Sequence, residues 1–135
     1  MDLQLKGRVA VITGPAKGMG RAVSLAFATE GTDLVLAGRD LAAIEPVAVE
    51  ARALGVRALV APCDMTDSTQ CAALARQALE TFGRIDILVN VAGGSGPIGK
   101  TGWETSPDEF DQIVELNMKG CFNTMRAVLP AMIAQ

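Results

Sequence analysis

The sequence contains no histidine and no tyrosine, and only 4% of its residues are aromatic. Without histidine, the chain cannot form a histidine-ligated metal site or a serine–histidine catalytic pair, and we predict no metal site. Positive charge is not in excess either, since 12 Lys and Arg against 15 Asp and Glu give a net charge of −3. Nucleic acids and anionic membrane surfaces attract clustered positive charge, so we expect neither as a partner.

Cysteines and long apolar runs are also scarce. The three cysteines, Cys63, Cys71 and Cys121, are odd in number and form no close pair along the chain, which predicts reduced thiols and a cytoplasmic protein. The first residues lack a basic segment followed by an apolar run, and no apolar stretch is long enough to cross a bilayer. We therefore expect no secretory signal and no transmembrane helix.

Short aliphatic runs alternate with segments of helical periodicity. Strands are expected near residues 9–12, 34–37, 59–61 and 85–89, and helices near 18–30, 40–54, 67–82 and from 106 to the end of the chain. Pro46 is expected to kink or shorten the second helix, and the glycine-rich stretch 93–106 is expected to form a loop. This alternation predicts one α/β domain over residues 1–135, a Rossmann-type doubly wound parallel sheet of which the first four strands and their helices are present.

Glycines are concentrated where the first strand meets the first helix, in the segment Thr13-Gly14-Pro15-Ala16-Lys17-Gly18-Met19-Gly20. A phosphate group at such a corner meets unpaired backbone N–H groups and the positive end of the helix dipole, and glycine lets it approach the backbone. The spacing differs from the dinucleotide fingerprint G-x-G-x-x-G and lacks the Gly-Lys-Ser/Thr ending of a nucleotide-triphosphate loop. The glycines could also serve the turn alone.

Four motifs in order resemble those of the short-chain dehydrogenases/reductases. The glycine segment resembles the family's cofactor motif, and Cys63-Asp64 lies where the third strand is expected to end. Asn90-Val91-Ala92-Gly93 follows the fourth strand and is similar to the family's Asn-Asn-Ala-Gly, with valine in place of the second asparagine. Asn117 lies within Leu116-Asn117-Met118-Lys119-Gly120. The resemblance covers the whole chain.

The resemblance implies that these motifs hold a nicotinamide dinucleotide. Its pyrophosphate and ribose would be lined by Gly14, Ala16, Lys17, Gly18, Met19 and Gly20. Asp64 would accept a hydrogen bond from the adenine amino group, with the backbone of Met65 beside it, although Asp64 could instead be a turn residue. Asn90, Ala92 and Gly93 would lie along the nicotinamide-side ribose, and Asn90 could also be a structural turn asparagine.

The segment after the second predicted strand bears on the choice of cofactor. An NAD site has a carboxylate here for the ribose 2′-hydroxyl, whereas an NADP site has a cation for the 2′-phosphate. Gly38 occupies the position of that acid, Arg39 follows it, and Lys17 is expected near the same ribose. Asp40 competes with this interpretation, but we assign it as the N-cap of the second helix; Arg39 could alternatively be a solvated surface charge. We predict NADP as the cofactor, with NAD as the alternative.

The resemblance also implies the interconversion of an alcohol and a ketone through a relay of Asn, Ser, Tyr and Lys. Only Asn117 of this relay has a counterpart here, because a chain without tyrosine holds no Tyr-x-x-x-Lys. The chain alone is expected to be inactive and to be the cofactor-binding half of a longer protein. Phe110, Ile113 and Val114 are predicted to mark the buried face of the last helical segment, with Asn117 on the same stripe; Asn117 could instead be a structural asparagine that kinks the helix.

Two features predict contacts with other chains. The fourth strand has no fifth strand beside it, which leaves an exposed edge, and the last helix is apolar on two faces. We expect a homo-oligomer, or a complex with a C-terminal fragment of the same protein, and a small-molecule carbonyl or alcohol substrate in the full-length protein. The alternative function is a non-catalytic dinucleotide-binding or assembly module. A methyltransferase-like domain is disfavoured, because the Asn90 turn and Asn117 would then have no shared purpose.

Overall fold

The computed structural model describes residues 1–135 and contains four strands and six helical segments. In chain order these are β1 (Val9–Thr13), α1 (Gly18–Thr29), β2 (Asp33–Gly38), α2 (Leu41–Ala53), β3 (Ala58–Pro62), α3 (Ser68–Phe82), β4 (Ile87–Asn90), α4 (Pro107–Val114), the short π-helical segment η1 (Glu115–Lys119) and α5 (Gly120–Ala134).

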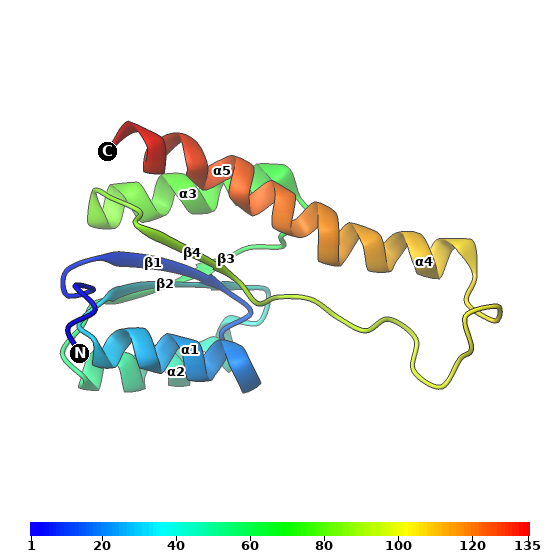
Figure 1. The fold of residues 1–135 in the computed structure, drawn as a ribbon, viewed down its shortest axis with the longest axis horizontal. Helices are drawn as coiled ribbons and strands as arrows, with labels where there is room; N and C mark the ends of the chain where they lie inside the picture. The colour runs from blue at the N-terminus through cyan, green and yellow to red at the C-terminus, as the bar shows by residue number, and fades with distance from the viewer.

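The strands form one parallel sheet in the order β3-β2-β1-β4. Helices α1 and α2 cover one face of the sheet, and α3 and α5 cover the other (Figure 1). Both faces of β1 are therefore shielded, and each of its five residues is buried, as expected for a continuous apolar strand in a parallel sheet. The predicted doubly wound Rossmann-type fold is confirmed.

The strand register places the functional motifs together at the C-terminal ends of the four strands. Thr13, at the end of β1, pairs with Ala37 of β2 and with Asn90 of β4, and Gly38 pairs with Pro62 of β3. The connections after the four strands therefore begin side by side. In open α/β sheets, ligands bind at these C-terminal ends of the strands.

Helix α2 begins as predicted but is not shortened by its proline. The Asp40 side chain accepts a hydrogen bond from the Ala43 amide at 3.1 Å, which confirms the predicted N-cap. The helix begins at Leu41 and continues through Pro46 to Ala53, so the predicted shortening of its first turns is wrong, and the kink stays a prediction. Proline leaves the carbonyl four residues earlier, that of Ala42, without its helical partner. Both Pro46 and Ala42 are exposed, so water can satisfy that carbonyl.

The fourth strand begins two residues later than the sequence predicts. Ile85 is fully buried, yet its backbone does not join the sheet. Its amide and carbonyl are instead bonded by the side-chain amide of Gln135, at 3.2 and 2.7 Å. β4 lies at an edge of the sheet, as expected.

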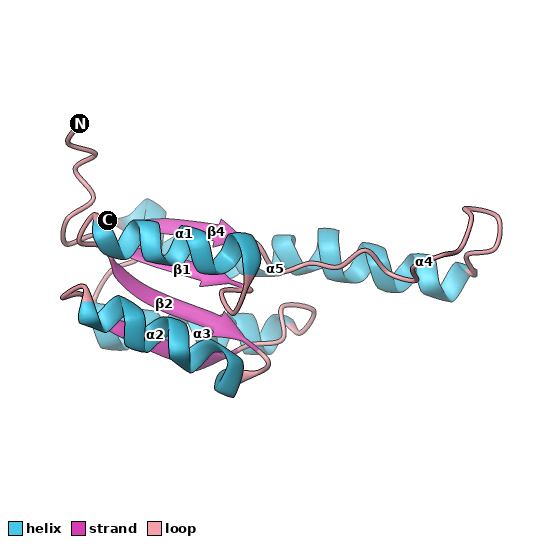
Figure 2. Cartoon of the chain, turned by 90° about the horizontal axis from the view of Figure 1, so that it is seen from below, coloured by secondary structure: helices cyan, strands magenta, loops and turns pink.

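Beyond β4 the chain leaves the body of the domain. The loop 93–106 and α4 extend away from the sheet as an arm (Figures 1 and 2). No residue of α4 is buried, and Phe110 is 60% exposed. The prediction of a buried helix face is therefore wrong for Phe110, whereas Ile113 and Val114 are half-buried, because α4 has no sheet beneath it and packs only on the loop that precedes it. The helix begins at a reciprocal capping box formed by Ser106 and Glu109.

Helix α5 is apolar on two faces, but the structure covers only one of them. Val128 is buried against the sheet-side core, and Cys121 and Met132 pack beside it. The opposite face is exposed at Phe122, Met125, Leu129 and Ile133. The predicted neighbouring subunit on this second face stays a prediction.

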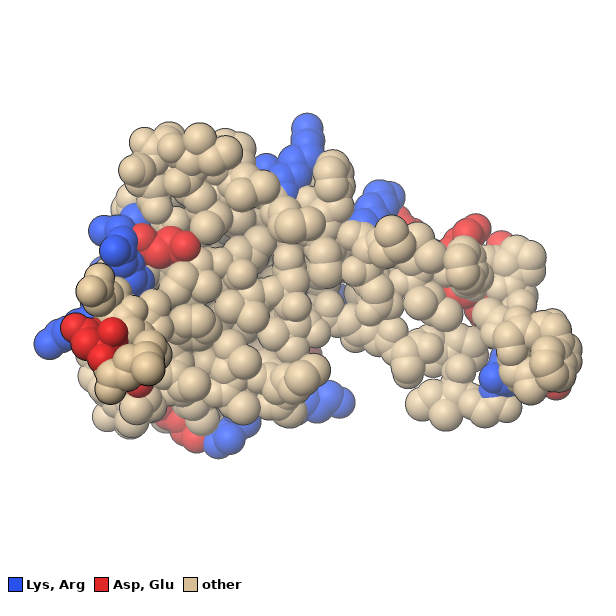
Figure 3. All heavy atoms as spheres, in the orientation of Figure 1, with Lys and Arg blue, Asp and Glu red and all other residues tan.

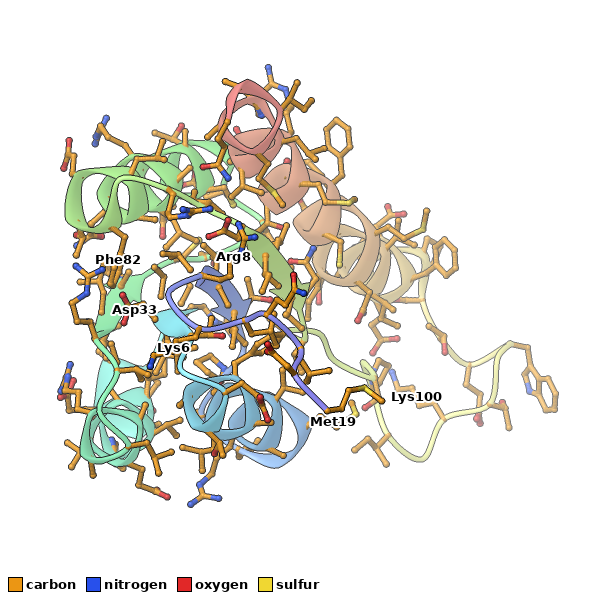
Figure 4. All side chains as sticks on the ribbon, turned by 60° about the vertical axis from the view of Figure 1, so that its left-hand side comes forward. Lys6, Arg8, Met19, Asp33, Phe82 and Lys100 are labelled. Atoms are coloured by element: carbon orange, nitrogen blue, oxygen red, sulfur yellow. The ribbon has the colours of Figure 1, made fainter.

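The end of the sheet away from the functional motifs is held by ion pairs. The Arg57 guanidinium lies 2.6 Å from the Asp33 carboxylate and 4.6 Å from the centre of the Phe82 ring. Asp33 and Phe82 lie at this end of the domain in Figure 4. These contacts join β2 to α3 and contribute to the fold, not to the site.

Candidate dinucleotide-binding site

A cavity of about 870 Å³ opens at the C-terminal ends of the strands. The space-filling view is indented on this side, where the arm leaves the body (Figure 3). All predicted cofactor-binding residues line the cavity except Gly20 and Asn90. Its volume lies within the range of small-molecule and cofactor sites. The structure thus brings together motifs that are up to about 80 residues apart in sequence.

The first glycine of the turn is fixed by close packing. Gly14 has φ +66°, a conformation that disfavours other residues. Its amide donates to the Ala37 carbonyl at 3.1 Å, so that amide is not available to a ligand. A β-carbon on Gly14 would lie 2.8 Å from the backbone nitrogen and α-carbon of Ala92. Glycine here allows the turn after β1 to contact the turn after β4.

The backbone amides that follow are unpaired. No amide from Ala16 to Gly20 donates a hydrogen bond within the protein; the first to do so is that of Arg21, to the Lys17 carbonyl. These N–H groups lie at the N-terminus of α1, and Ala16 to Met19 line the cavity. Gly18 has φ +53° and nothing within 4 Å of its side-chain position. The corner therefore has the unpaired donors and the open approach that an anion-binding site requires.

Gly20 makes the geometry of this corner possible without lining the cavity. A β-carbon at Gly20 would overlap the Gly14 carbonyl oxygen and lie 2.8 Å from its carbon. The first turn of α1 therefore packs directly on the backbone of the preceding loop. The side chain of Met19, in contrast, is 77% exposed and projects away from α1 (Figure 4).

The sequence analysis missed the role of Thr13, although this residue opens the glycine motif. Its buried hydroxyl oxygen accepts hydrogen bonds from the amides of Val91 and Ala92, at 3.1 and 3.2 Å. The β1 corner is thereby tied to the turn after β4. A polar residue at the end of an otherwise aliphatic strand was the available signal.

Replacing this threonine by valine tests the tie. Thr13→Val keeps the shape of the side chain and leaves two amides without an acceptor, so we expect a loss of about 1–2 kcal/mol in the free energy of unfolding. Urea unfolding measures the loss. Thr81→Val is the matched control, since Thr81 is exposed and bonds only to the Gln77 carbonyl of its own helix. Equal stability of Thr13→Val and the wild type would contradict this role.

Two cations border the cavity without protein partners. Lys17 and Arg39 are both exposed, and neither forms an ion pair within the protein. Asp40, the only carboxylate on this connection, is engaged as the cap of α2. A side chain at Gly38 would meet Ile44 at 2.8 Å, so an acid there would displace a buried residue. The connection after β2 therefore presents positive charge to the cavity.

The connection after β3 presents one acceptor and one donor. One carboxylate oxygen of Asp64 accepts from the amide and the hydroxyl of Thr66, at 3.0 and 2.8 Å, and these bonds lower the pKa of Asp64. Asp64 is therefore ionised, and its second oxygen has no hydrogen bond within the protein. The neighbouring Met65 amide also makes none. Asp64 thus has the turn role that we considered and still faces the cavity.

Two cysteines that are separated in sequence meet beside the cavity. The sulfur atoms of Cys63 and Cys71 are 3.9 Å apart, and both residues are buried, free cysteines. Burial and the Cys71 thiol raise the pKa of Cys63 to about 12. Cys63 therefore lines the cavity as a neutral thiol and is not a nucleophile.

The two predicted site asparagines lie outside the cavity. The Asn90 side-chain oxygen accepts from the Thr124 hydroxyl at 2.7 Å, which ties β4 to α5. The Asn117 side chain accepts from the Gly94 amide at 3.1 Å and donates to the Gly94 and Ile113 carbonyls, both at 2.9 Å. Asn117 lies in the π-helical segment η1. The Asn117 amide is fully engaged in structural bonds, whereas Asn90 is engaged through its side-chain oxygen; each therefore has the structural role that was its alternative interpretation.

Metal sites and membrane-spanning helices were also considered. No group of three or more His, Cys, Asp or Glu side chains is placed to hold a metal ion. None of the helices combines the length and the apolar character needed to span a bilayer.

Together the parallel sheet, the unpaired amides and the cavity define a Rossmann-type nucleotide-binding domain. The chain belongs to the short-chain dehydrogenase family, whose model matches residues 8–135. It is 35% identical over 131 residues to a 7alpha-hydroxysteroid dehydrogenase of Escherichia coli K12, covering 97% of this chain and 50% of that protein.

Two solved structures are similar in fold. A metagenomic short-chain oxidoreductase in complex with NADP matches with a TM-score of 0.88 and 37% identity, over 96% of this chain and 58% of that one. A short-chain dehydrogenase/reductase of Burkholderia phymatum in complex with NAD matches with a TM-score of 0.89 and 34% identity, over 98% and 47%. The chain thus spans about half the length of these relatives.

Proposed function

We propose that this chain binds NADP(H) and is the cofactor-binding half of an oxidoreductase that interconverts an alcohol and a ketone. The observation that carries the proposal is the row of unpaired backbone amides from Ala16 to Met19, which opens onto the cavity at the start of α1. Similarity to an NADP complex and to a hydroxysteroid dehydrogenase supports it.

The residues present fit a dinucleotide. The pyrophosphate would lie against the amides at residues 16–20, where Gly18 leaves the approach open. Adenine would lie against Asp64 and Met65, whose free carboxylate oxygen and free amide match an amino group and a ring nitrogen. The nicotinamide-side ribose would lie along Ala92 and Gly93, which line the cavity. When bound, the cofactor supplies a hydride acceptor or donor.

NADP is preferred in this proposal because Arg39, on the connection after β2, and Lys17, in the turn after β1, place two cations at the cavity. A 2′-phosphate is a dianion, and charge-assisted hydrogen bonds contribute about 1.5–3 kcal/mol each. Arg39 and Lys17 form no ion pair within the protein, although the charge of Arg39 helps to lower the pKa of Asp64, and no acid lies at Gly38. NAD stays the alternative.

Charge reversal at Arg39 tests the cofactor preference. We expect Arg39→Asp to weaken NADPH binding at least tenfold and to leave NADH binding unchanged, because only the 2′-phosphate is repelled. Fluorescence titration with the two reduced cofactors measures both affinities. Arg76→Asp is the matched control, since Arg76 is exposed on α3 and does not line the cavity. Equal losses for NADPH and NADH in Arg39→Asp would remove the argument for NADP.

Two further measurements separate the alternatives. The alternative is a non-catalytic dinucleotide-binding or assembly module. The intact mass of the natural protein decides between the two, because continuation into a Ser and a Tyr-x-x-x-Lys supports the enzyme. Titration with S-adenosylmethionine tests the methyltransferase-like alternative. We assign Asn117 to the catalytic side of the full protein, where its engaged side chain would hold the loop after β4 against η1.

A further inference from the structure

A side chain of α5 reaches the connection that follows β3, far away in sequence. The Asn123 side-chain nitrogen donates to the Met65 carbonyl at 2.9 Å and to the Thr66 carbonyl at 3.3 Å. Asn123 is only 6% exposed. It is thus a buried polar group whose donors are directed at two successive backbone carbonyls.

The contact between α5 and this connection is close on both sides of Asn123. A β-carbon on Gly120 would lie 2.9 Å from the Met65 side chain, so α5 approaches within van der Waals contact. From α3, the Cys71 thiol also donates to the Met65 carbonyl, at 3.6 Å. The Met65 peptide is therefore held on its carbonyl side, while its amide is free and the residue lines the cavity.

We propose that Asn123 is a positioning residue for recognition of the adenine ring, an inference that rests on the proposed function. Asp64 by itself orders the turn from one side, through the Thr66 amide and hydroxyl and the Asp67 amide. The Asp64 amide also donates to the Gln70 side chain at 2.8 Å, which holds the turn on the side of α3. The bonds from Asn123 anchor the turn to α5 and fix where the free Met65 amide and Asp64 oxygen lie.

Adenine recognition depends on this placement because the ring must contact the Met65 amide and the Asp64 carboxylate oxygen at the same time. The amide donates and the carboxylate oxygen accepts, so the pair matches the ring nitrogen and the amino group of adenine. Hypoxanthine carries an oxo group in place of that amino group and meets the carboxylate as acceptor against acceptor. An anchored turn therefore discriminates between the two bases, whereas a loose turn can move away from the unfavourable contact.

The test compares NADPH with nicotinamide hypoxanthine dinucleotide phosphate, reduced form, in the wild type and in Asn123→Leu. Leucine has a similar volume and no donor. We expect NADPH affinity to fall about fivefold and the affinity of the hypoxanthine analogue to change less than twofold, so that discrimination is lost. Amide hydrogen exchange at Thr66 and Asp67 should become faster in the variant without cofactor.

A matched control separates positioning from general loss of stability. Thr32→Val removes another buried hydroxyl, which bonds to the Leu5 carbonyl at the opposite end of the sheet; we expect its preference for NADPH to equal that of the wild type. A folded Asn123→Leu that keeps the wild-type preference, or that loses affinity equally for both cofactors, would overturn the inference. A wild type that binds neither cofactor would contradict the proposed function, and the inference with it.

Discussion

Gly20→Ala is expected to abolish cofactor binding, with at least a 100-fold loss in NADPH affinity, equivalent to about 2.7 kcal/mol. The added methyl group would overlap the Gly14 carbonyl oxygen and lie 3.0 Å from the Pro15 α-carbon. These contacts are with backbone atoms, which no rotamer change relieves. The loop must therefore move away from α1, and the unpaired amides lose their common direction toward a phosphate.

The same substitution should lower the free energy of unfolding by about 1–3 kcal/mol, as overpacking does. Titration with NADPH and urea unfolding measure the two effects on one preparation. Gly102→Ala is the matched control, because Gly102 has negative φ and nothing within 4 Å of its side-chain position; we expect wild-type affinity and stability from it. A Gly20→Ala protein that binds NADPH normally would show that the glycine corner is not the phosphate site.

Asp86→Ala should cause a large loss of stability that leaves the site chemistry intact. The Asp86 carboxylate accepts from the Val9 amide at 2.8 Å, from Arg8 at 3.1 Å and from Arg84 at 2.5 and 2.8 Å. Arg8, labelled in Figure 4, directly precedes β1 and lies at the end of the sheet away from the cavity. Alanine leaves the buried amide at the start of the central strand unpaired, and we expect a loss of about 2–3 kcal/mol in urea unfolding at neutral pH. Asp111→Ala, which removes an exposed carboxylate without partners, should have little effect.

The effect of Asp86 should depend on pH. Burial opposes ionisation of this carboxyl, but hydrogen bonds from Arg84, the Val9 amide and Arg8 outweigh it and hold the pKa of Asp86 below its usual value. Because the pKa of Asp86 is lower in the folded state, its ionised carboxylate stabilises the protein at pH values above the unfolded-state pKa of about 3.9. This contribution is lost as the pH falls through the folded-state pKa. The difference in stability between wild type and Asp86→Ala should therefore narrow below about pH 4. A constant difference down to about pH 2 would contradict this account.

Much of the fold could be predicted from local patterns, because those patterns are themselves causes. Residues 9–12 are continuous and aliphatic, and such a run is stable only as a strand covered on both faces. Asp40 and Ser106 cap helices through bonds to amides three residues away, and these contacts need nothing beyond the local chain. The prediction was wrong at Ile85, where the backbone pairs with Gln135, fifty residues away.

The sequence by itself determined the alternation of strands and helices along the chain, the glycine corner after β1, and the presence of two cations, Lys17 and Arg39, after the first two strands. Only the tertiary structure showed that Thr13 binds the turn after β4, that Cys63 meets Cys71 and that Asn123 holds the Met65 carbonyl. It also showed that Phe110 is exposed on a helix whose periodicity indicates burial. The reason is physical: capping and strand propensity act between neighbours along the chain, whereas these contacts depend on which elements the folded sheet brings together.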